Sequence, residues 1–329
     1  MVLQEQAPIE EKPLEMREVD RPEPGPGRIR VKVSACGLCH TDLHTVEGDL
    51  DLHKRPIIPG HQIVGTVDAL GEGTGRFQPG DRVGMAWLHE ACGECEYCRA
   101  GMENLCEDAL FTGWDVDGGY AEYTTVGELW AYPIPEGIGD VEATPLLCGG
   151  IIGYRAFRLS GAASGKRLGL YGFGNSAHMT IQVARHAGCE VYVFTRSEEH
   201  KRHAEQLGAV WVGEAGDPVP EKMDASIMFA PAGGLVPPAM AALDKGGTLA
   251  LAGIWMSPIP EMDYEEHLYH EKVLRSVANS TREDGEELLA LAAEIPIETT
   301  TTTFPLEEAG EALLGMKESR FNGDPVLVP

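Results

Sequence analysis

Positive charge is scarce in this sequence. Its 329 residues include 26 Lys and Arg against 52 Asp and Glu, a formal net charge of −26 at pH 7. No stretch gathers basic residues into a track for phosphates, so we expect no nucleic-acid partner. The excess of acids indicates a solvated, negatively charged surface instead.

Long hydrophobic runs are missing as well. No run reaches the roughly 18 apolar residues of a membrane-spanning helix. The acidic opening MVLQEQAPIEEKPLEM also lacks the apolar core of a secretory signal. We therefore expect no membrane partner and a cytoplasmic protein. In that reducing compartment, clustered cysteines favour metal binding over disulfides.

Cysteine is infrequent but concentrated. The chain has 8 cysteines, and half of them fall in one polar stretch, as Cys92, Cys95, Cys98 and Cys106. Thiolates at this spacing can all reach one tetrahedral ion and close its coordination sphere. An iron–sulfur cluster is the alternative, but the Cys-Pro pair that accompanies it in ferredoxins is missing. The pattern predicts a structural zinc ion that holds a loop without a core of its own.

Three regions of the chain differ in their strand and helix patterns. Residues 1–150 contain short β-like runs with Gly and Pro turns, such as RIRVKVSACG and IVGTVDALG. Residues 151–275 alternate strand and helix patterns, which predicts a parallel, doubly wound sheet. Residues 276–329 contain two helical patterns and a terminal apolar run. The length also favours more than one domain, so we expect an α/β protein with a β-rich part and a Rossmann-type part.

A glycine-containing loop lies early in the alternating region. GFGNSA, residues 172–177, follows the strand pattern RLGLY and precedes a helical pattern. Gly172 permits a tight turn, Gly174 lets a pyrophosphate approach the backbone, and Ala177 is small enough to pack the helix on the sheet. With a further strand–helix unit downstream, the loop predicts a dinucleotide site.

A second set of metal-ligand types is dispersed along the chain. Cys39 lies in CGLCHTDLH, His61 in PGHQIVGTV and Cys148 in PLLCGG. Two thiolates and one imidazole would leave one zinc position open for water or substrate, as in catalytic sites. Taken singly, Cys148 suits a small core residue and His61 a turn. Only the surrounding motifs support the interpretation of these three residues as ligands of one metal ion.

Those motifs resemble a known family. CGLCHTDLH, GHQIVGTVDALG, QPGDRVG, the four-cysteine stretch, DGGYAEY, PLLCGG and GFGNSA follow one another as in zinc-dependent medium-chain alcohol dehydrogenases, over nearly the whole chain. The resemblance implies a GroES-like catalytic domain of residues 1–150 and 276–329 that carries both zinc sites. It also implies a dinucleotide-binding Rossmann domain of residues 151–275, and a homodimer or homotetramer.

The resemblance assigns roles to the dispersed set. It implies that Cys39, His61 and Cys148 hold the catalytic zinc, and that Asp42 orients His61 from behind. One departure concerns Gln62, because the family usually has glutamate after this histidine. We hypothesise that the uncharged Gln62 leaves the metal a stronger Lewis acid. The simpler alternative is that the amide only replaces one hydrogen bond.

Further roles follow in the same way. The resemblance implies that Thr41 accepts the proton of the substrate alcohol and that His44 ends the relay leading it out through the nicotinamide ribose. It places His40 near the cofactor pyrophosphate. Trp87 matches an aromatic wall of the substrate pocket, although plain core packing explains it equally well.

The second strand of the Rossmann pattern indicates which cofactor is used. Aligned with the family, its end falls on Thr195, followed by Arg196 and Ser197. Two hydroxyls and a guanidinium suit a 2′-phosphate, because arginine pairs well with phosphate oxygens. NADP(H) is therefore favoured. Two glutamates follow directly and weaken the positive field, so NAD(H) stays possible.

The expected reaction is reversible hydride transfer between a primary or secondary alcohol and NAD(P), with two zinc ions per chain. A polyol or sugar-alcohol dehydrogenase of the same fold is one alternative. A non-catalytic redox sensor that binds zinc and nucleotide is another, but binding alone needs no proton relay of the Thr41 and His44 kind. Both cysteine sets disfavour a zinc-free quinone reductase.

Overall fold

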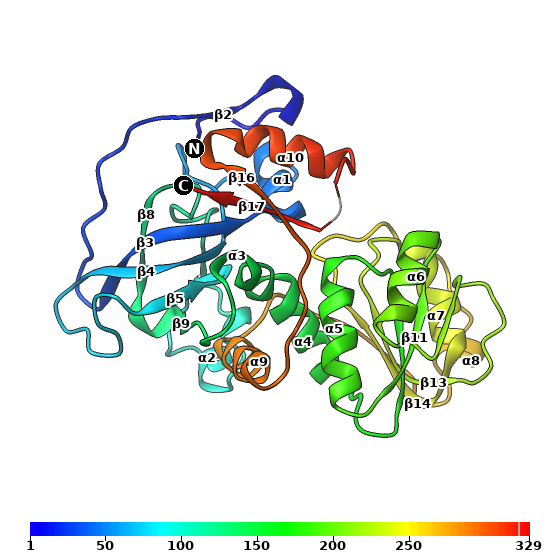
Figure 1. The fold of residues 1–329 in the computed structure, drawn as a ribbon. Helices are drawn as coiled ribbons and strands as arrows, with labels where there is room; N and C mark the ends of the chain where they lie inside the picture. The colour runs from blue at the N-terminus through cyan, green and yellow to red at the C-terminus, as the bar shows by residue number, and fades with distance from the viewer. Residues whose placement is uncertain (322) are drawn as a thin grey trace. The chain divides into compact units, whose positions relative to one another are not determined.

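The computed structural model describes residues 1–321 and 323–329, which form two compact units (Figure 1). The first unit comprises Met1–Cys148 and Thr281–Pro329, and the second comprises Gly149–Ser280. The C-terminal segment therefore returns to the unit in which the chain begins. Among the described residues, no helix is long and apolar enough to cross a membrane.

The first unit is built mainly from strands. Its strands are β1 Val2–Leu3, β2 Leu14–Glu15, β3 Arg28–Gly37, β4 Gln62–Leu70, β5 Arg82–Met85, β6 Leu88–Glu90, β7 Leu110–Phe111, β8 Tyr123–Gly127, β9 Ala131–Pro133, β16 Thr301–Pro305 and β17 Asp324–Val328. Its α-helices are α1 His40–Glu47, α2 Glu96–Arg99, α3 Asp140–Ala143, α9 Arg282–Glu294 and α10 Ala309–Lys317.

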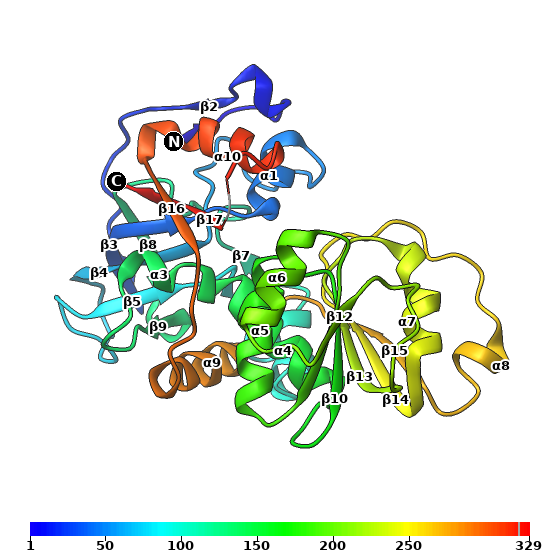
Figure 2. The ribbon, with the colours of Figure 1, turned by 45° about the vertical axis from the view of Figure 1, so that its right-hand side comes forward.

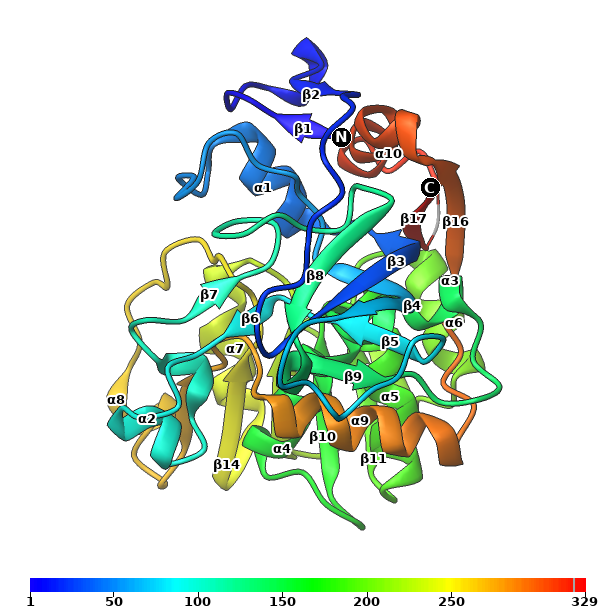
Figure 3. The same ribbon diagram turned by 90° about the vertical axis from the view of Figure 1, so that its left-hand side faces the viewer.

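Strand β3 organises the main sheet of this unit. The sheet runs β16-β17-β3-β4-β5-β9, with β8 also paired to β3 (Figure 3). Alternate residues Ile29, Val31 and Val33 of β3 are buried in the core, which is the period-two pattern of a strand with one apolar face. The C-terminal β17 pairs with the end of β3 that leads to α1. This pairing fixes the start of α1, where several candidate site residues lie.

The second unit contains a parallel sheet of six strands, as the alternating pattern predicts. Its strands are β10 Arg167–Tyr171, β11 Glu190–Phe194, β12 Trp211–Gly213, β13 Met223–Met228, β14 Leu243–Leu251 and β15 Val273–Ser276. Its α-helices are α4 Gly149–Ser160, α5 Asn175–His186, α6 Glu198–Gln206, α7 Val236–Ala242 and α8 Tyr264–His267. Figure 2 shows α5 and α7 on opposite sides of the strands.

The strand order of this sheet is the doubly wound one. It runs β12-β11-β10-β13-β14-β15, and every neighbouring pair is parallel. The chain starts at the central β10, moves outward to β12, then crosses back to β13. Ligands in such sheets bind beyond the carboxyl ends of the strands where the order reverses. The loop after β10, which begins at Gly172, lies at that reversal.

Candidate functional site

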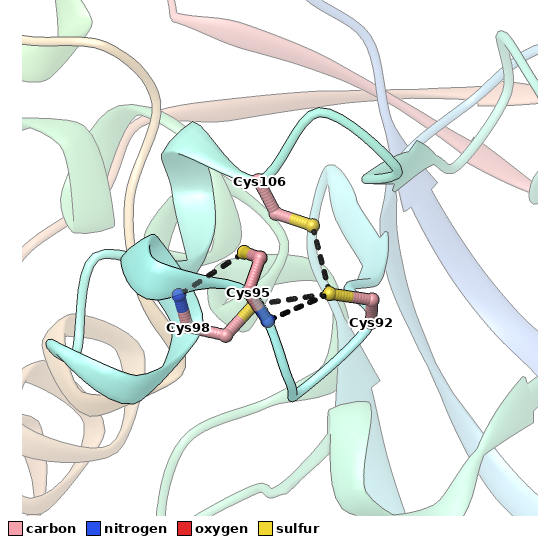
Figure 4. Close-up of side chains that lie close together, drawn as sticks. All are labelled: Cys92, Cys95, Cys98 and Cys106. Carbon is pink, nitrogen blue, oxygen red and sulfur yellow. Dashed lines mark hydrogen bonds between the residues drawn. The ribbon is translucent and has the colours of Figure 1, made fainter.

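The four clustered cysteines converge on one point (Figure 4). All their sulfur atoms lie within 4.8 Å of one another, with Cys92 Sγ 3.9 Å from Cys98 Sγ and 3.6 Å from Cys106 Sγ. Sulfurs about 2.3 Å from a tetrahedral zinc would be separated by nearly this much. Backbone N–H groups of Glu94 and Cys95 donate to Cys92 and lower the pKa of its thiol to about 7. The donor set therefore fits a closed zinc site.

The loop around these cysteines has little core of its own. No residue of α2 is buried, and Met102 and Leu105 are 40% and 41% exposed. Cys106, unlike its three partners, is buried. A buried carboxylate, Glu103, accepts hydrogen bonds from the backbone and guanidinium of Arg282 at the start of α9. A zinc ion bound by the four thiolates would therefore add to this ion pair in holding the loop in place.

The structure also brings Cys39, His61 and Cys148 together. Cys39 Sγ lies 3.5 Å from His61 Nε2 and 3.9 Å from Cys148 Sγ, and all three ligand atoms lie within 4.8 Å of one another. Cys39 is the residue before α1, His61 the residue before β4 and Cys148 the residue before α4. Two thiols and one imidazole at the corners of a tetrahedron fit a zinc ion and leave its fourth corner open.

Asp42 supports two members of this set. Its Oδ2 accepts the backbone N–H of Cys39 at 2.8 Å, and its Oδ1 lies 3.1 Å from His61 Nδ1. Cys39 is the N-cap of α1, and its own sulfur accepts the N–H of Thr41, so the first turn forms a capping box. A histidine that gives one ring nitrogen to a carboxylate presents the other to a metal.

The electrostatics of the set favour a thiolate. The hydrogen bond from Cys148, with a contribution from the His61 ring, lowers the pKa of Cys39 well below its usual value. The same hydrogen bond and burial raise the pKa of Cys148. Burial raises the pKa of Asp42, and His61 offsets part of that effect. A lowered pKa favours the thiolate form of Cys39, with the Cys148 thiol as its hydrogen-bond donor.

The remaining candidates of the first unit surround α1. Thr41 is half-buried in the first turn, and the exposed His40 begins the helix. His44 lies one turn further on, with its Nδ1 2.7 Å from Asp49 Oδ2. The His44 side chain is 29% exposed, so protons can exchange between this ring and water.

Trp87 belongs to an aromatic cluster beside His61. Its ring centroid lies 6.2 Å from that of His61 and 4.7 Å from that of Phe111, which in turn lies 5.8 Å from Trp114. Trp87 is half-buried, so the cluster presents part of its surface outside the core. Gln62 is buried, and its Nε2 has no hydrogen-bond partner among the described residues.

The glycine loop of the second unit has an open side. Gly172 has φ +84°, and a Cβ there would lie 2.9 Å from the backbone nitrogen of Ala230, so only glycine fits this turn. At Gly174, the N-cap of α5, an added Cβ would meet no atom within 4 Å. Ala177, in the first turn of α5, is fully buried. The start of α5 therefore has open space at the exposed Gly174, and the backbone N–H groups of a helix start suit a pyrophosphate.

The three residues proposed to select the cofactor follow β11 directly. Thr195 is buried and donates its N–H to the Gly213 carbonyl oxygen, whereas Arg196 is exposed. Ser197 caps α6, and its hydroxyl accepts the N–H of His200. Arg196 therefore lies at the surface, immediately before Ser197 and the start of α6, and helix starts favour anions.

Two features were not predicted from the sequence. In the second unit, the imidazole of His178 packs against His203, with 4.3 Å between ring centroids, and against Phe173 of the glycine loop. Burial lowers the pKa of His178 to about 4, so this ring is neutral. In the first unit, Tyr120 is fully buried, with its ring against Gly60, the residue before His61. The motif DGGYAEY marked the position without indicating what the tyrosine contacts.

Together these arrangements define a class of protein. One unit supplies a closed thiolate site and a second, open site with the ligands of a Lewis-acidic zinc. The other unit has the parallel sheet and glycine loop of dinucleotide-binding proteins. Such a combination is that of a zinc-dependent nicotinamide oxidoreductase.

Comparison with known proteins specifies the family. The alcohol dehydrogenase GroES-like domain matches residues 25–136, and the zinc-binding dehydrogenase model matches residues 177–294. "Probable alcohol dehydrogenase AdhA" of Mycobacterium tuberculosis is 48% identical over 98% of this chain and 94% of its own length. The chain belongs to the zinc-containing medium-chain alcohol dehydrogenase family, and by this homology it is an NAD(P)-dependent alcohol dehydrogenase. The expected α/β class, with GroES-like and Rossmann-type parts, is confirmed.

Solved structures agree on the fold and differ in cofactor. An NAD-dependent alcohol dehydrogenase is 25% identical, with a TM-score of 0.89, over 100% of this chain and 98% of its own. CAD from Helicobacter pylori, complexed with NADP(H), is 25% identical, with a TM-score of 0.82, over 92% of this chain and 91% of its own. A nicotinamide dinucleotide is thus implied for this chain, whereas the choice between NAD and NADP is not.

Proposed function

We propose that this enzyme interconverts apolar primary or secondary alcohols with their aldehydes or ketones, uses NADP(H) in preference to NAD(H), and holds its catalytic zinc through Cys39, His61 and Cys148. The observation that carries the proposal is the convergence of these three ligand atoms within 4.8 Å, with Asp42 against His61. Zinc held there would supply a Lewis acid that favours loss of the alcohol's proton in one direction and polarises a carbonyl in the other.

Two residues of α1 transfer the proton of the substrate alcohol to water. Thr41 adjoins the ligand Cys39, and we assign its hydroxyl to accept the proton of the alcohol. His44, one turn further along α1, passes that proton on to water. Its Nδ1 lies 2.7 Å from Asp49 Oδ2, and 29% of its side chain stays exposed to the water that would take the proton.

The aromatic cluster favours an apolar substrate. Trp87, Phe111 and Trp114 gather beside His61, and rings of this kind bind hydrocarbon chains or other rings well. A polyol would need hydrogen-bonding groups for its hydroxyls, and this wall offers few. Gln62 adds no charge next to His61, so the ligand set lacks the extra negative charge of a glutamate. The polyol alternative is therefore the weaker one.

Arg196 is the proposed determinant of NADP(H) preference. Replacing it with alanine removes a charge-assisted contact to the 2′-phosphate, worth about 1.5–3 kcal/mol. We expect Arg196→Ala to lower kcat/KM for NADPH about 10- to 100-fold and to leave that for NADH nearly unchanged. Steady-state kinetics with both cofactors measure this.

Arg202 provides the matched control for that experiment. It is an exposed arginine further along α6, and its side chain bonds to the Glu198 carbonyl oxygen. Arg202→Ala should leave the preference as it is. An equal loss for both cofactors in Arg196→Ala would instead mean that the guanidinium does not recognise the 2′-phosphate.

The cytoplasmic localisation and the homodimer or homotetramer remain predictions. An unpaired edge supports an oligomer, because β15 is the last strand of its sheet and Val273 on it is 44% exposed. An edge strand offers unpaired N–H and C=O groups that another chain can bind. The apolar side chain of Val273 would be covered by a second copy in that arrangement.

The proposed function is tested by metal analysis combined with activity. We expect two zinc ions per chain in the purified protein and reduction of benzaldehyde with NADPH. Removal of the more labile ion by a chelator should abolish the reaction, and added zinc should restore it. A protein that binds nucleotide but shows no turnover with both ions present would support the redox-sensor alternative.

A further inference from the structure

The indole of Trp114 is held from two directions by residues 51–53, which lie between α1 and β4. Its Nε1 donates to the Asp51 carbonyl oxygen at 2.8 Å. The His53 imidazole packs against the indole, with 4.1 Å between ring centroids and 31° between ring planes. Together these contacts restrict the rotation of the indole about its side-chain bonds.

His53 is itself oriented by Asp115. Its Nδ1 lies 2.6 Å from Asp115 Oδ1, and Asp115 Oδ2 accepts the backbone N–H of Phe111 at 2.8 Å. An ionised carboxylate can only accept hydrogen bonds, so Nδ1 of His53 carries the proton in this contact. The side chain of His53 is 55% exposed, whereas that of Asp115 is only 10% exposed. One largely buried carboxylate therefore orients both the His53 ring and the turn that carries Trp114.

Trp114 belongs to the aromatic cluster beside His61. Its ring centroid lies 6.1 Å from that of Trp87 and 5.8 Å from that of Phe111, and Trp87 lies 6.2 Å from His61. Both tryptophans are half-buried, so part of each indole lies outside the packed core. Flat aromatic rings pack against one another at such distances in offset or tilted arrangements. A substrate ring beside this cluster could pack in the same way.

We propose that Trp114 gives the enzyme a preference for alcohols and aldehydes that carry an aromatic ring, and that His53 is a positioning residue that keeps the indole in the required orientation. This inference rests on the proposed function, because it needs a substrate oxygen at the open zinc position. It adds no chemical step. Benzaldehyde presents a ring to the indole, whereas acetaldehyde has a single methyl group beyond its reacting carbon and no ring to pack.

Single variants measure the two roles with zinc-loaded enzyme, saturating NADPH and each aldehyde in turn. Trp114→Ala should raise KM for benzaldehyde at least about tenfold, because it removes the surface that the substrate ring contacts. His53→Ala leaves the indole in place but free to turn, and should raise that KM about three- to tenfold. In both variants kcat for benzaldehyde and KM for acetaldehyde should stay within about twofold of the wild type, because only binding of the ring is lost.

The double variant tests whether His53 acts through Trp114. A residue that only orients the indole has no further effect once the indole is gone. We therefore expect the variant with both alanines to have the same KM for benzaldehyde as Trp114→Ala alone. Additive increases in KM would mean that His53 contributes independently of Trp114, and would overturn its role as a positioning residue.

Lys54→Ala is the matched control. Lys54 forms an ion pair with Asp117, so it joins the same two segments as His53 does, but through a carboxylate instead of the indole. Its variant should keep the wild-type KM for both aldehydes. An unchanged KM for benzaldehyde in His53→Ala, or an equal rise for both aldehydes, would overturn the proposal. A wild-type enzyme that carries both zinc ions and reduces neither aldehyde would instead refute the proposed function.

Discussion

Cys148→Ala is expected to reduce the zinc content from two ions per chain to one and to lower kcat/KM by at least about a thousandfold. Cys148 Sγ lies 3.9 Å from Cys39 Sγ, the spacing of two corners of a zinc tetrahedron. Without this thiolate, one cysteine and one histidine remain, too few to retain the ion against a chelator. The reaction then loses the group that stabilises the alkoxide, whereas the four-cysteine ion should stay.

Another buried cysteine supplies the control for this variant. Cys189 is 8% exposed and donates to the Ala163 carbonyl oxygen in the second unit. Cys189→Ala removes a buried thiol of the same size and should keep both ions and the activity. Metal analysis by mass spectrometry, with kinetics on the same samples, shows whether the loss of zinc and the loss of activity are specific to Cys148. Full activity of Cys148→Ala with one ion per chain would exclude the proposed catalytic site.

Local patterns sufficed to predict much of this architecture. In the second unit four of the six strands, β10, β11, β13 and β14, are each followed by a helix over a short stretch, so the alternation of strand and helix patterns indicates a parallel sheet. The four cysteines fall within Cys92–Cys106, and ligands so close in sequence constrain one another through the loop between them. The prediction of their convergence therefore did not depend on the rest of the fold.

The second metal site could not be derived in that way. Cys39 and Cys148 lie 109 positions apart in the chain, and nothing local to either residue shows that the sheet brings them together. Their assignment came from the resemblance to a family. The contacts of Tyr120 and of Trp87 with Phe111 were missed for the same reason, since they depend on how distant loops pack.

Cys95→Ala should open the four-cysteine loop while the sheet of the first unit stays folded. Structural zinc contributes on the order of 10–16 kcal/mol to the folding of small zinc domains. This loop has few other contacts, because no residue of α2 is buried and Leu105 is 41% exposed. The ion pair between Glu103 and Arg282 anchors only one end of it. Without the ion, most of the loop should sample unfolded conformations.

Trypsin gives a direct measure of that opening. Arg99 is the only basic residue between Cys92 and Cys106, so cleavage after it reports on this loop alone. A protease needs several extended residues, which the folded loop around α2 does not provide. We expect Cys95→Ala to be cut between Arg99 and Ala100 at least a hundredfold faster than the wild type, with the two fragments identified by mass. Cys189→Ala should match the wild type. Equal cutting of Cys95→Ala and wild type would mean that packing, rather than metal, holds the loop together.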